Sequence, residues 1–450
     1  MEVTLFQMLQ AREDRAARQR QLREDYKTPL ICFTMNIPGP VKTSPLIRRA
    51  FRWGQRQLEQ QLPEILHREA TEGVTGCEAY YAVDADPLTL KGLCTAIEDA
   101  APLGRLFDMD VLDANGEKLD RSLVRGKSRD CIVCGAPGRG CASRRLHALA
   151  ELTAAVEAIM TAHFLSADSE RIATLAVESL LEEVRTTPKP GLVDQRNNGS
   201  HRDMDVSTFT ASAEALRPYF RDCFRIGQAA AAEPAEETFR RLRQAGLQAE
   251  KEMYRATGGV NTHKGAIFTL GLLCGSLGRL WRPEGPFVEL PALLNQCAKL
   301  AKYAVKTDFQ GLCRAKTAGE RLYLETGRTG IRGEAAAGLP SVAEIALPVF
   351  RQGLAAGLSR NDAGALALLH LIAQVEDTNL YHRGGEAGAD WAKEAARSLL
   401  PCPTRQQLEA LDDAFIAKNL SPGGCADLLA VTCFLDRLEE EQNHLIMQLA

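Results

Sequence analysis

Hydrophobic and polar positions follow one pattern up to about residue 160 and another beyond it. In the first part, short apolar runs bounded by turn-forming residues predict β-strands at 29–36, 78–84 and 105–111. The segments 2–25, 45–66 and 87–100 are instead predicted to be helical. We therefore predict an N-terminal α+β domain over residues 1–160.

Beyond residue 160 the strand signals nearly vanish, and apolar residues recur at helical spacing. The predicted helical segments are 169–184, 205–225, 235–256, 289–305, 363–379 and 405–417. A last helix follows Ser421, which suits an N-cap, with Pro422 at the first helical position. We predict that residues 161–450 form a larger all-α helical domain, so that the chain is a multidomain protein.

Charge and composition exclude some classes of partner. The 450 residues include 54 Lys and Arg and 58 Asp and Glu, and the first 150 carry 22 basic and 20 acidic side chains. Neither part is basic enough to bind nucleic acid by bulk charge. The longest nearly apolar stretch, 266–278, is too short to span a membrane. With a charged segment at 1–23 and thirteen cysteines, we expect a cytoplasmic protein with reduced thiols.

Two acidic residues stand two apart on the third predicted strand. Asp108 and Asp110 therefore point to the same face of that strand. Carboxylates at this spacing can hold Mg²⁺ against a phosphoryl group that is being transferred. The alternative is a solvated strand edge without a ligand.

A cysteine and histidine cluster lies near the end of the first domain. Cys131, Cys134, Cys141 and His147 could close a tetrahedral Zn²⁺ site, because three thiolates and an imidazole form a complete ligand set. Only one Cys-x2-Cys half of the cluster has standard spacing, so free thiols in a glycine-rich loop remain the alternative.

The first domain resembles a known family over about residues 5–155. The segments that carry the resemblance are 36–42, 102–111 and 129–147, and the family is that of the citrate lyase holo-acyl-carrier-protein synthases, or apo-citrate lyase phosphoribosyl-dephospho-CoA transferases. The resemblance implies a nucleotidyltransferase that attaches a phosphoribosyl-dephospho-CoA group to a serine of the acyl carrier protein (γ subunit) and releases diphosphate. It also implies Mg²⁺ at Asp108 and Asp110, and phosphate binding by Lys42 and Arg105.

The loops of the second domain hold more polar side chains than connectors need. His201, Asp203 and Asp205 alternate, which suits cation binding if the segment is extended. In the alternative interpretation, Asp205 only caps the next helix. The glycine-rich segment 258–265 opens an apolar helix, where free N–H groups, the helix dipole and Lys264 would attract a phosphate.

Further loops combine glycines with arginines and carboxylates, at 319–323, 330–336, 376–385 and 421–427. Because such loops join apolar helices, we expect them to meet at one end of a helical bundle and to form one site. Arginine is suited to this site because its planar guanidinium can donate two parallel hydrogen bonds to a phosphate.

Residues 165–445 resemble the triphosphoribosyl-dephospho-CoA synthase family, through the segments 188–194, 203–205, 259–265, 330–336, 376–379 and 420–429. The resemblance implies that ATP gives up adenine while the 2′-hydroxyl of 3′-dephospho-CoA bonds to its ribose C1. The residues expected to bind phosphates or substrate are Lys189, His201, Asn261, His263, Lys264, Arg321, Arg332 and Arg383. The carboxylates expected to act in catalysis are Asp194, Asp203, Asp205, Glu334, Glu376 and Asp377, with Mg²⁺ at Asp203 and Asp205.

Together the two resemblances indicate a bifunctional enzyme that makes the citrate lyase prosthetic group and installs it on the acyl carrier protein. Two alternatives remain open. The malonate decarboxylase pathway uses the same prosthetic group and a related synthase. A zinc-knuckle binding module on a helical scaffold is possible as well, but it leaves the charged loops of the second domain unexplained.

Overall fold

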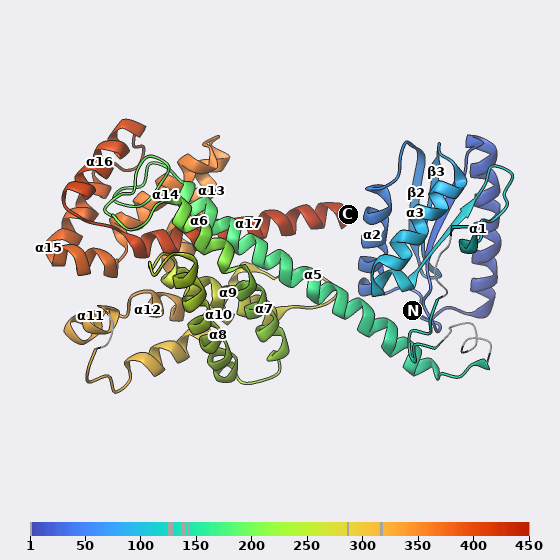
Figure 1. Cartoon of the computed structure of the whole chain (residues 1–450), viewed down its shortest axis with the longest axis horizontal. Helices are drawn as coiled ribbons and strands as arrows, with labels where there is room; N and C mark the ends of the chain where they lie inside the picture. The colour runs from blue at the N-terminus through green and yellow to red at the C-terminus, as the bar shows by residue number, and fades with distance from the viewer. Residues whose placement is uncertain are drawn as a thin grey trace. The chain divides into compact units, whose positions relative to one another are not determined.

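The computed structural model describes residues 2–124, 129–136, 141, 144–285, 288–315 and 318–449. Contacts divide the chain into two units (Figure 1). The first, which we call the sheet unit, contains residues 1–167 together with 282–285. The second, the helical unit, contains residues 168–281 and 286–450.

The sheet unit is built on four strands in the order β2-β3-β1-β4, and each neighbouring pair is antiparallel. The strands are β1 (Leu30–Met35), β2 (Ile65–Gly73), β3 (Gly76–Val83) and β4 (Phe107–Leu112). In the centre of the sheet, Phe33 lies opposite Ala79 of β3 and Met109 of β4. Strand β4 is therefore an edge strand.

Three helices cover the sheet: α1 (Leu5–Tyr26), α2 (Pro45–Glu59) and α3 (Pro87–Ala100). On one face, Leu22 of α1 packs with Leu30, Cys32 and Tyr80. Alternate residues point to the other face, where the ring of Phe33 stacks on Phe51 of α2 at 4.9 Å. Two short 3₁₀-helices, Pro102–Leu106 and Arg121–Val124, flank β4.

The three strands predicted from the sequence are present, each shifted by at most two residues at either end. The prediction of a helix over 45–66 is wrong at its C-terminal end. Helix α2 ends at Glu59, and β2 starts at Ile65. This strand lies at the other edge of the sheet and alternates half-buried with exposed positions, so it lacks the apolar run that marks a buried strand.

No β-strand occurs among the described residues of the helical unit. The boundary between the units falls within α5 (Leu149–Arg185). The helices that follow are α6 (Val206–Ala215), α7 (Arg217–Ala229), α8 (Ala235–Ala256), α9 (Lys264–Leu280), α10 (Leu290–Phe309), α11 (Ala318–Thr326), α12 (Gly330–Ala336), a π-helix (Ser341–Ala346), α13 (Leu347–Ala355), α14 (Arg360–Gln374), α15 (Thr378–Arg397), α16 (Arg405–Ala417) and α17 (Gly423–Leu449). A small N-terminal sheet region followed by a larger helical part therefore agrees with the prediction.

Helix α9 forms the core of the helical unit, and most of its residues are buried. Glycines let its neighbour α7 approach closely. A Cβ atom on Gly227 would lie 1.9 Å from the carbonyl oxygen of Gly275, and one on Gly278 would lie 1.9 Å from that of Phe224. The C-terminal half of α9 is thereby packed closely against α7.

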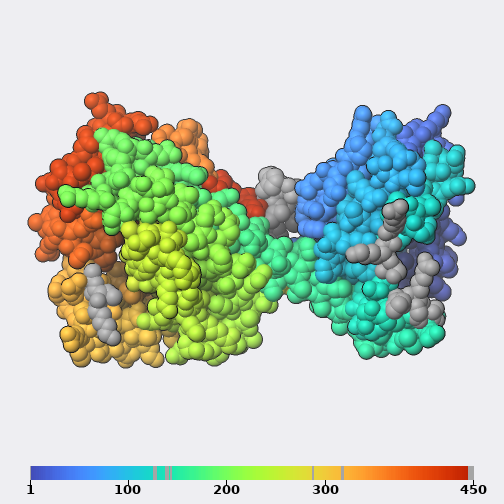
Figure 2. Space-filling view, viewed as in Figure 1, coloured from blue at the N-terminus to red at the C-terminus, as the bar shows by residue number. Residues whose placement is uncertain are grey.

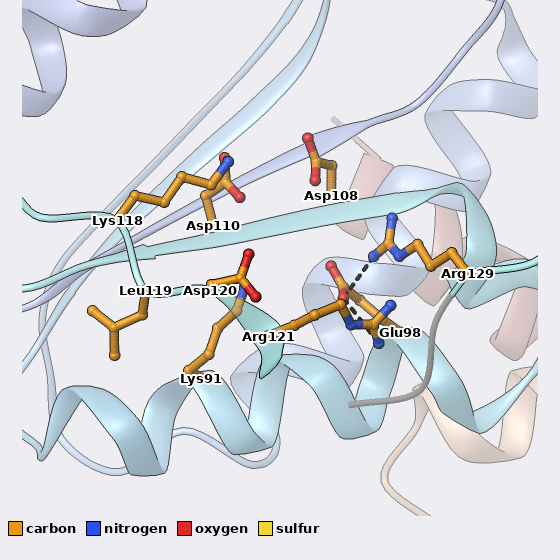
Figure 3. Close-up of a pocket in the computed structure, with 9 residues that line it drawn as sticks. All are labelled: Lys91, Glu98, Asp108, Asp110, Lys118, Leu119, Asp120, Arg121 and Arg129. Atoms are coloured by element: carbon orange, nitrogen blue, oxygen red, sulfur yellow. Dashed lines mark hydrogen bonds and ion pairs between the residues drawn. The ribbon is translucent and has the colours of Figure 1, made fainter. Parts of the chain in front are cut away.

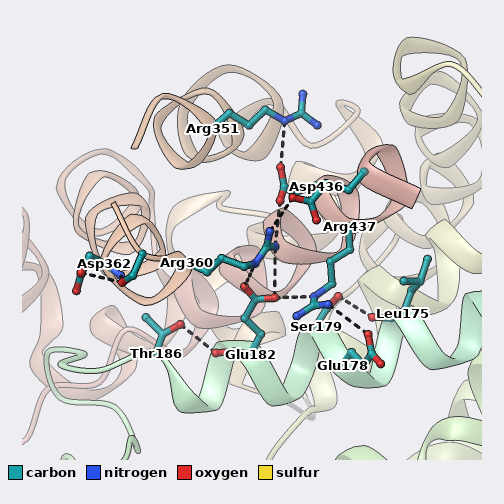
Figure 4. A network of polar contacts seen from close by, with 12 residues as sticks. Leu175, Glu178, Ser179, Glu182, Thr186, Arg351, Arg360, Asp362, Asp436 and Arg437 are labelled. Carbon is teal, nitrogen blue, oxygen red and sulfur yellow. Dashed lines mark hydrogen bonds and ion pairs between the residues drawn. The ribbon is translucent and has the colours of Figure 1, made fainter. Parts of the chain in front are cut away.

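Ion pairs connect α5 to α14 and α17 inside the helical unit (Figure 4). The carboxylate of Glu182 on α5 accepts from Arg360 Nε (2.7 Å) and Arg437 Nε (2.6 Å). Arg360 also pairs with Asp436 at 3.0 Å, and Arg351 of α13 pairs with the same carboxylate at 3.3 Å. This network fixes the C-terminal end of α5, from which the next loop starts.

That loop packs against segments from much later in the sequence. The hydroxyl of Ser200 donates to the carbonyl oxygen of Leu420 at 2.6 Å. Figure 2 shows the same relation on the surface, where the green residues that follow α5 lie beside red C-terminal residues. None of the helices that the structure describes is both long enough and apolar enough to span a membrane.

Candidate functional site

A pocket of about 340 Å³ lies along β4 of the sheet unit, and we call it the edge pocket (Figure 3). Acidic and basic side chains line it in equal number, with one leucine. The lining residues are Lys91, Glu98, Asp108, Asp110, Lys118, Leu119, Asp120, Arg121 and Arg129. Such a mixed lining suits a phosphate that is bound together with a cation.

Two charged residues of α3 bind the backbone of the edge strand. Glu98 Oε1 accepts from the backbone N–H of Met109 at 2.9 Å, and Lys91 Nζ donates to the backbone carbonyl oxygen of Met109 at 3.0 Å. Both side chains are buried. They stand seven residues apart and thus on one face of the helix. By satisfying the outer edge of β4, they prevent another strand from pairing there.

Asp108 and Asp110 share one face of β4, as predicted, and both line the pocket. Lys118 Nζ pairs with Asp110 Oδ2 at 2.5 Å. Loss of solvent, followed by the charge of Asp110, raises the pKa of Asp108 above its ordinary value. Two carboxylates in this relation would be stabilised by a cation, and oxygen donors are what Mg²⁺ prefers, so the pair fits a Mg²⁺ site.

Three arginines gather beside these carboxylates. Arg129 Nη2 pairs with the buried Glu98 at 2.6 Å. The Nε and Nη1 atoms of Arg121 are buried and have no hydrogen-bond partner among the described residues. Burial, followed by the charges of Arg129 and Arg121, lowers the pKa of Arg105, which does not itself line the pocket. The concentration of guanidinium groups suits an anion with several phosphates.

Lys42 is not among the residues that line the edge pocket. Its Nζ donates to the carbonyl oxygen of Ile37 at 2.6 Å. Burial and the nearby Arg12 lower its pKa. The structure therefore does not bring Lys42 together with Asp108 and Asp110.

The predicted Cys/His cluster comes together. One ligand atom from each of Cys131, Cys134, Cys141 and His147 lies within 4.8 Å of the others. The sulfur atoms of Cys134 and Cys141 are 3.5 Å apart, too far for a disulfide bond. Hydrogen bonds from the backbone, first that of Cys134, lower the pKa of Cys131 to about 7. Sulfur and imidazole donors at these distances fit Zn²⁺.

In the helical unit, carboxylates hold the loop that follows α5. Asp194 is buried, and its Oδ2 accepts from the backbone N–H of Lys189 at 2.8 Å. Its Oδ1 accepts from the backbone N–H groups of Arg196 and Asn197. The fully buried Asp412 of α16 accepts from the backbone N–H of Gly191, the side-chain amide of Asn197 and the guanidinium of Arg196. Asp194 thus shapes the loop.

Lys189 is 1% exposed and forms an ion pair with Glu183 of α5. Its Nζ also donates to the carbonyl oxygen of Glu183 at 2.8 Å. Burial nevertheless raises the pKa of Glu183, and the charge of Asp194 adds to this. Lys189 is therefore held in the interior of the helical unit, beside the carboxylate of Glu183.

The first turns of α15 and α17 lie against each other. Asp377 caps α15, where its Oδ1 accepts from the N–H groups of Asn379 and Leu380, and its Oδ2 accepts from that of Cys425 in α17 at 2.8 Å. Gly424 lets this carboxylate approach, because a Cβ atom there would lie 3.0 Å from Asp377 Oδ2.

Asp427, one turn into α17, reaches the N-terminus of α9. A Cβ atom on Gly265 would lie 1.9 Å from Asp427 Oδ2, so a larger residue here would displace this carboxylate. Loss of solvent, followed by the charges of Glu183 and Asp377, raises the pKa of Asp427 well above its ordinary value. We call Glu183, Asp377 and Asp427 the carboxylate cluster. It lies where α9, α15 and α17 begin.

His263, the residue before α9, is buried beside this cluster. Its Nδ1 lies 2.7 Å from the hydroxyl of Ser212, whereas its Nε2 is buried and has no hydrogen-bond partner in the described part of the chain. Burial, with a contribution from Lys189, lowers the pKa of His263 to about 3. The imidazole is therefore neutral at physiological pH, and it can bind a phosphate only as a neutral group.

His201, Asp203 and Asp205 do not converge as the ligands of a metal site would. Among the described residues, the Cys/His cluster is the group whose possible ligand atoms lie close enough together to hold a metal ion. Asp205 caps α6 and accepts from the backbone N–H of Thr208 at 2.8 Å, as the alternative interpretation expected. His201 lies between Ser421, at 3.0 Å, and Arg383, at 3.3 Å. This links the loop to the segment before α17.

The partners of several other predicted residues are groups outside the carboxylate cluster. Glu334 accepts from the backbone N–H of Ser341. Glu376 pairs with Lys393 and Arg328. Arg332 pairs with Asp308 at 2.5 Å. Three further predicted residues are exposed: Arg321, Asn261 and Lys264. Of these, Lys264 pairs with Glu250 at 2.9 Å.

Comparison with known proteins covers both units. A family model described as ATP:dephospho-CoA triphosphoribosyl transferase matches residues 169–445, and one described as apo-citrate lyase phosphoribosyl-dephospho-CoA transferase matches residues 3–163. The chain is 36% identical to the protein CitXG of Haemophilus influenzae over 453 residues, which cover 96% of each chain. It is 32% identical to CitXG of Leuconostoc mesenteroides subsp. cremoris over 462 residues, 97% of each chain.

The chain belongs to the CitXG family. It is a transferase with two enzyme domains of citrate lyase prosthetic-group synthesis, which confirms the predicted fusion. A 2-(5''-triphosphoribosyl)-3'-dephosphocoenzyme-A synthase of Pectobacterium atrosepticum is 45% identical over 258 residues, 57% of this chain and 85% of that protein. The edge pocket lies within the matched range 3–163, and the carboxylate cluster lies within the matched range 169–445.

Several charged residues of the two CitXG sites were not among the predicted site residues: Lys91, Glu98, Lys118, Arg121 and Arg129 in the edge pocket, and Glu183 and Asp427 in the helical unit. Glu98 and Glu183 stand near the ends of predicted helices, where a glutamate normally faces solvent. Asp427 offered one signal, because it follows Gly423 and Gly424 at the start of an otherwise apolar helix.

Proposed function

We propose that the helical unit makes 2′-(5″-triphosphoribosyl)-3′-dephospho-CoA from ATP and 3′-dephospho-CoA, with release of adenine. The sheet unit then transfers the phosphoribosyl-dephospho-CoA group to a serine of the citrate lyase acyl carrier protein, with release of diphosphate. The observation that carries this proposal is the presence of one separate, highly charged site in each of the two matched family ranges. We place both steps in the cytoplasm.

In the helical unit, the carboxylate cluster supports the cleavage of the bond between adenine and ribose. This cleavage builds positive charge on the ribose, which the charged members of the cluster would stabilise. Asp427 is suited to donate the proton that the leaving adenine needs, because loss of solvent and the nearby carboxylates raise its pKa and so favour its protonated form. The N-terminus of α9 and the exposed Lys264 would bind the triphosphate, through the helix dipole and the charge of the lysine.

In the sheet unit, Asp108 and Asp110 would hold Mg²⁺, which neutralises charge on the phosphate under attack. Arg121 and Arg129 then bind the phosphate oxygens, and Glu98 orients Arg129 through their ion pair. Lys118 keeps the carboxylate of Asp110 in place. We also propose Zn²⁺ as the ion of the Cys/His cluster, since thiolates and imidazole are its preferred ligands.

The synthase activity is tested by incubating the protein with ATP, 3′-dephospho-CoA and Mg²⁺ and measuring adenine. We expect Asp427→Asn to lower kcat about 100-fold or more with little change in KM, because it removes a proton donor that acts in the transition state. Asp222→Asn, at an exposed position on α7, is the matched control and should leave kcat unchanged. A folded wild-type protein that releases no adenine would refute the synthase proposal.

A further inference from the structure

Few of the side chains that the structure describes between Arg129 and Ala148 are buried. In this segment, Cys141 is buried, while the other described residues are half-buried or exposed. Leu146, for example, is 59% exposed. A segment with so little apolar burial needs another constraint to keep one conformation, and a bound metal ion is a common one in small domains.

The local backbone presents the ligands as a metal knuckle would. The carbonyl oxygen of Cys131 accepts from the backbone N–H of Gly135 at 2.9 Å, and the Cys131 N–H donates to the carbonyl oxygen of Ala136 at 2.7 Å. The N–H of Val133 points to the sulfur of Cys131 at 3.5 Å. This tight turn directs the sulfur atoms of Cys131 and Cys134 to the same side.

A second observation points independently to a ligand. The Nε2 atom of His147 is buried and has no hydrogen-bond partner among the residues that the structure describes. A buried nitrogen left unpaired costs about 1–3 kcal/mol, and a metal ion among the three sulfur atoms would satisfy it.

The same segment supplies groups to the edge pocket. Arg129, which lines the pocket and pairs with Glu98, precedes the first cysteine ligand by two residues. The carbonyl oxygen of Asp130, next to that ligand, accepts from the guanidinium of Arg105. The position of Cys131 therefore determines where two arginines of the sheet unit lie.

We propose that Zn²⁺ bound by Cys131, Cys134, Cys141 and His147 fixes Arg129 and Arg105 at the edge pocket. The ion does not touch the substrate, and the arginines are positioned through the backbone at residues 129–131. The inference that zinc binds rests on the Cys/His cluster alone and is independent of the proposed function. The positioning role rests on the proposed function, in which the edge pocket is the site of carrier modification.

Zinc binding is tested by metal analysis of the purified full chain and by Co²⁺ substitution. We expect one zinc per chain, and thiolate-to-cobalt charge-transfer absorption in the substituted protein. Cys134→Ser should lose both, whereas Cys402→Ser, an exposed cysteine of the helical unit, should keep both. A chain without zinc that shows no such absorption with Co²⁺ overturns the proposal, whatever its activity.

The positioning role is tested with Cys134→Ser in three assays. Carrier labelling should fall about 10- to 100-fold through a higher KM for the triphosphoribosyl intermediate, because misplaced binding groups are costly. Adenine release should stay unchanged. Amide hydrogen exchange at residues 129–136 should become faster, and this readout holds even if the sheet unit has a different substrate. Unchanged exchange and labelling in a zinc-free variant would overturn the positioning role.

Discussion

At the scale of single residues, His263 shows how burial sets the state of a side chain. The hydroxyl of Ser212 contacts one ring nitrogen, and none of the described residues offers a hydrogen-bond partner to the other. The positive charge of Lys189 lies close enough to oppose protonation. The imidazole is thus kept neutral at the N-terminus of α9, where a second positive charge would repel Lys189.

The predicted consequence is a histidine that does not titrate in the usual range. Because the pKa of His263 is lowered to about 3, its ring signals in NMR spectra should not move between pH 8 and pH 5. The unfolded chain takes up this proton near pH 6.5, so the group's contribution to folding stability falls as the pH drops from about 6.5 towards 3.

The ring signals of His263 are assigned as those that disappear from the NMR spectrum of the His263→Asn variant. The same variant should lose less stability than the wild type between pH 7 and pH 5, measured by chemical denaturation. A His263 signal that titrates near pH 6.5 would contradict the buried, neutral imidazole.

Sequence reasoning found site residues best where charge stands out from its surroundings. Asp108 and Asp110 interrupt an apolar strand, and both line the edge pocket. Glu98 and Lys91 belong to a helix whose sequence gives no sign that these charges are buried against the backbone of β4. Their partner at Met109 is distant in the sequence, so only the fold reveals them.

At the scale of elements, the ion pairs of Glu182 connect three helices. Glu182 is largely buried and binds both Arg360 and Arg437. Its neutralisation leaves these arginines without their shared partner, so Glu182→Gln should lower the free energy of unfolding by about 3 kcal/mol. Chemical denaturation of the full chain measures this change.

Glu178→Gln is the matched control, because Glu178 stands one turn earlier on α5, binds only Arg437 among the described residues and is 47% exposed. Its effect should stay below about 0.5 kcal/mol. Equal effects of the two substitutions would show that the network adds nothing beyond a surface ion pair.

Helices were predictable where local signals agree with packing. The bounds of α3, α8 and α16 match the predicted segments, since apolar spacing and end residues coincide there. The predicted helix 205–225 is divided at Leu216, before Pro218, where proline suits the first turn of α7. Strand β2 has a polar, edge-strand sequence, and only its pairing with β3 defines it.

At the scale of the whole molecule, the chain joins a synthase and a transferase domain that act on one prosthetic group. Fusion raises the concentration of the intermediate near the second site without requiring a channel. The two sites share no residues, because the edge pocket belongs to the sheet unit and the carboxylate cluster to the helical unit. A substitution in one site should therefore abolish that site's activity and leave the other activity intact.

The most direct test of two independent sites is a complementation experiment on carrier labelling. Asp108→Asn/Asp110→Asn should release adenine normally but fail to label the acyl carrier protein. Asp427→Asn should fail to release adenine but label the carrier when the triphosphoribosyl intermediate is supplied. A mixture of the two folded variants with ATP, 3′-dephospho-CoA and Mg²⁺ should restore labelling. If either variant loses both activities, or the mixture labels no carrier, the two-site account is contradicted.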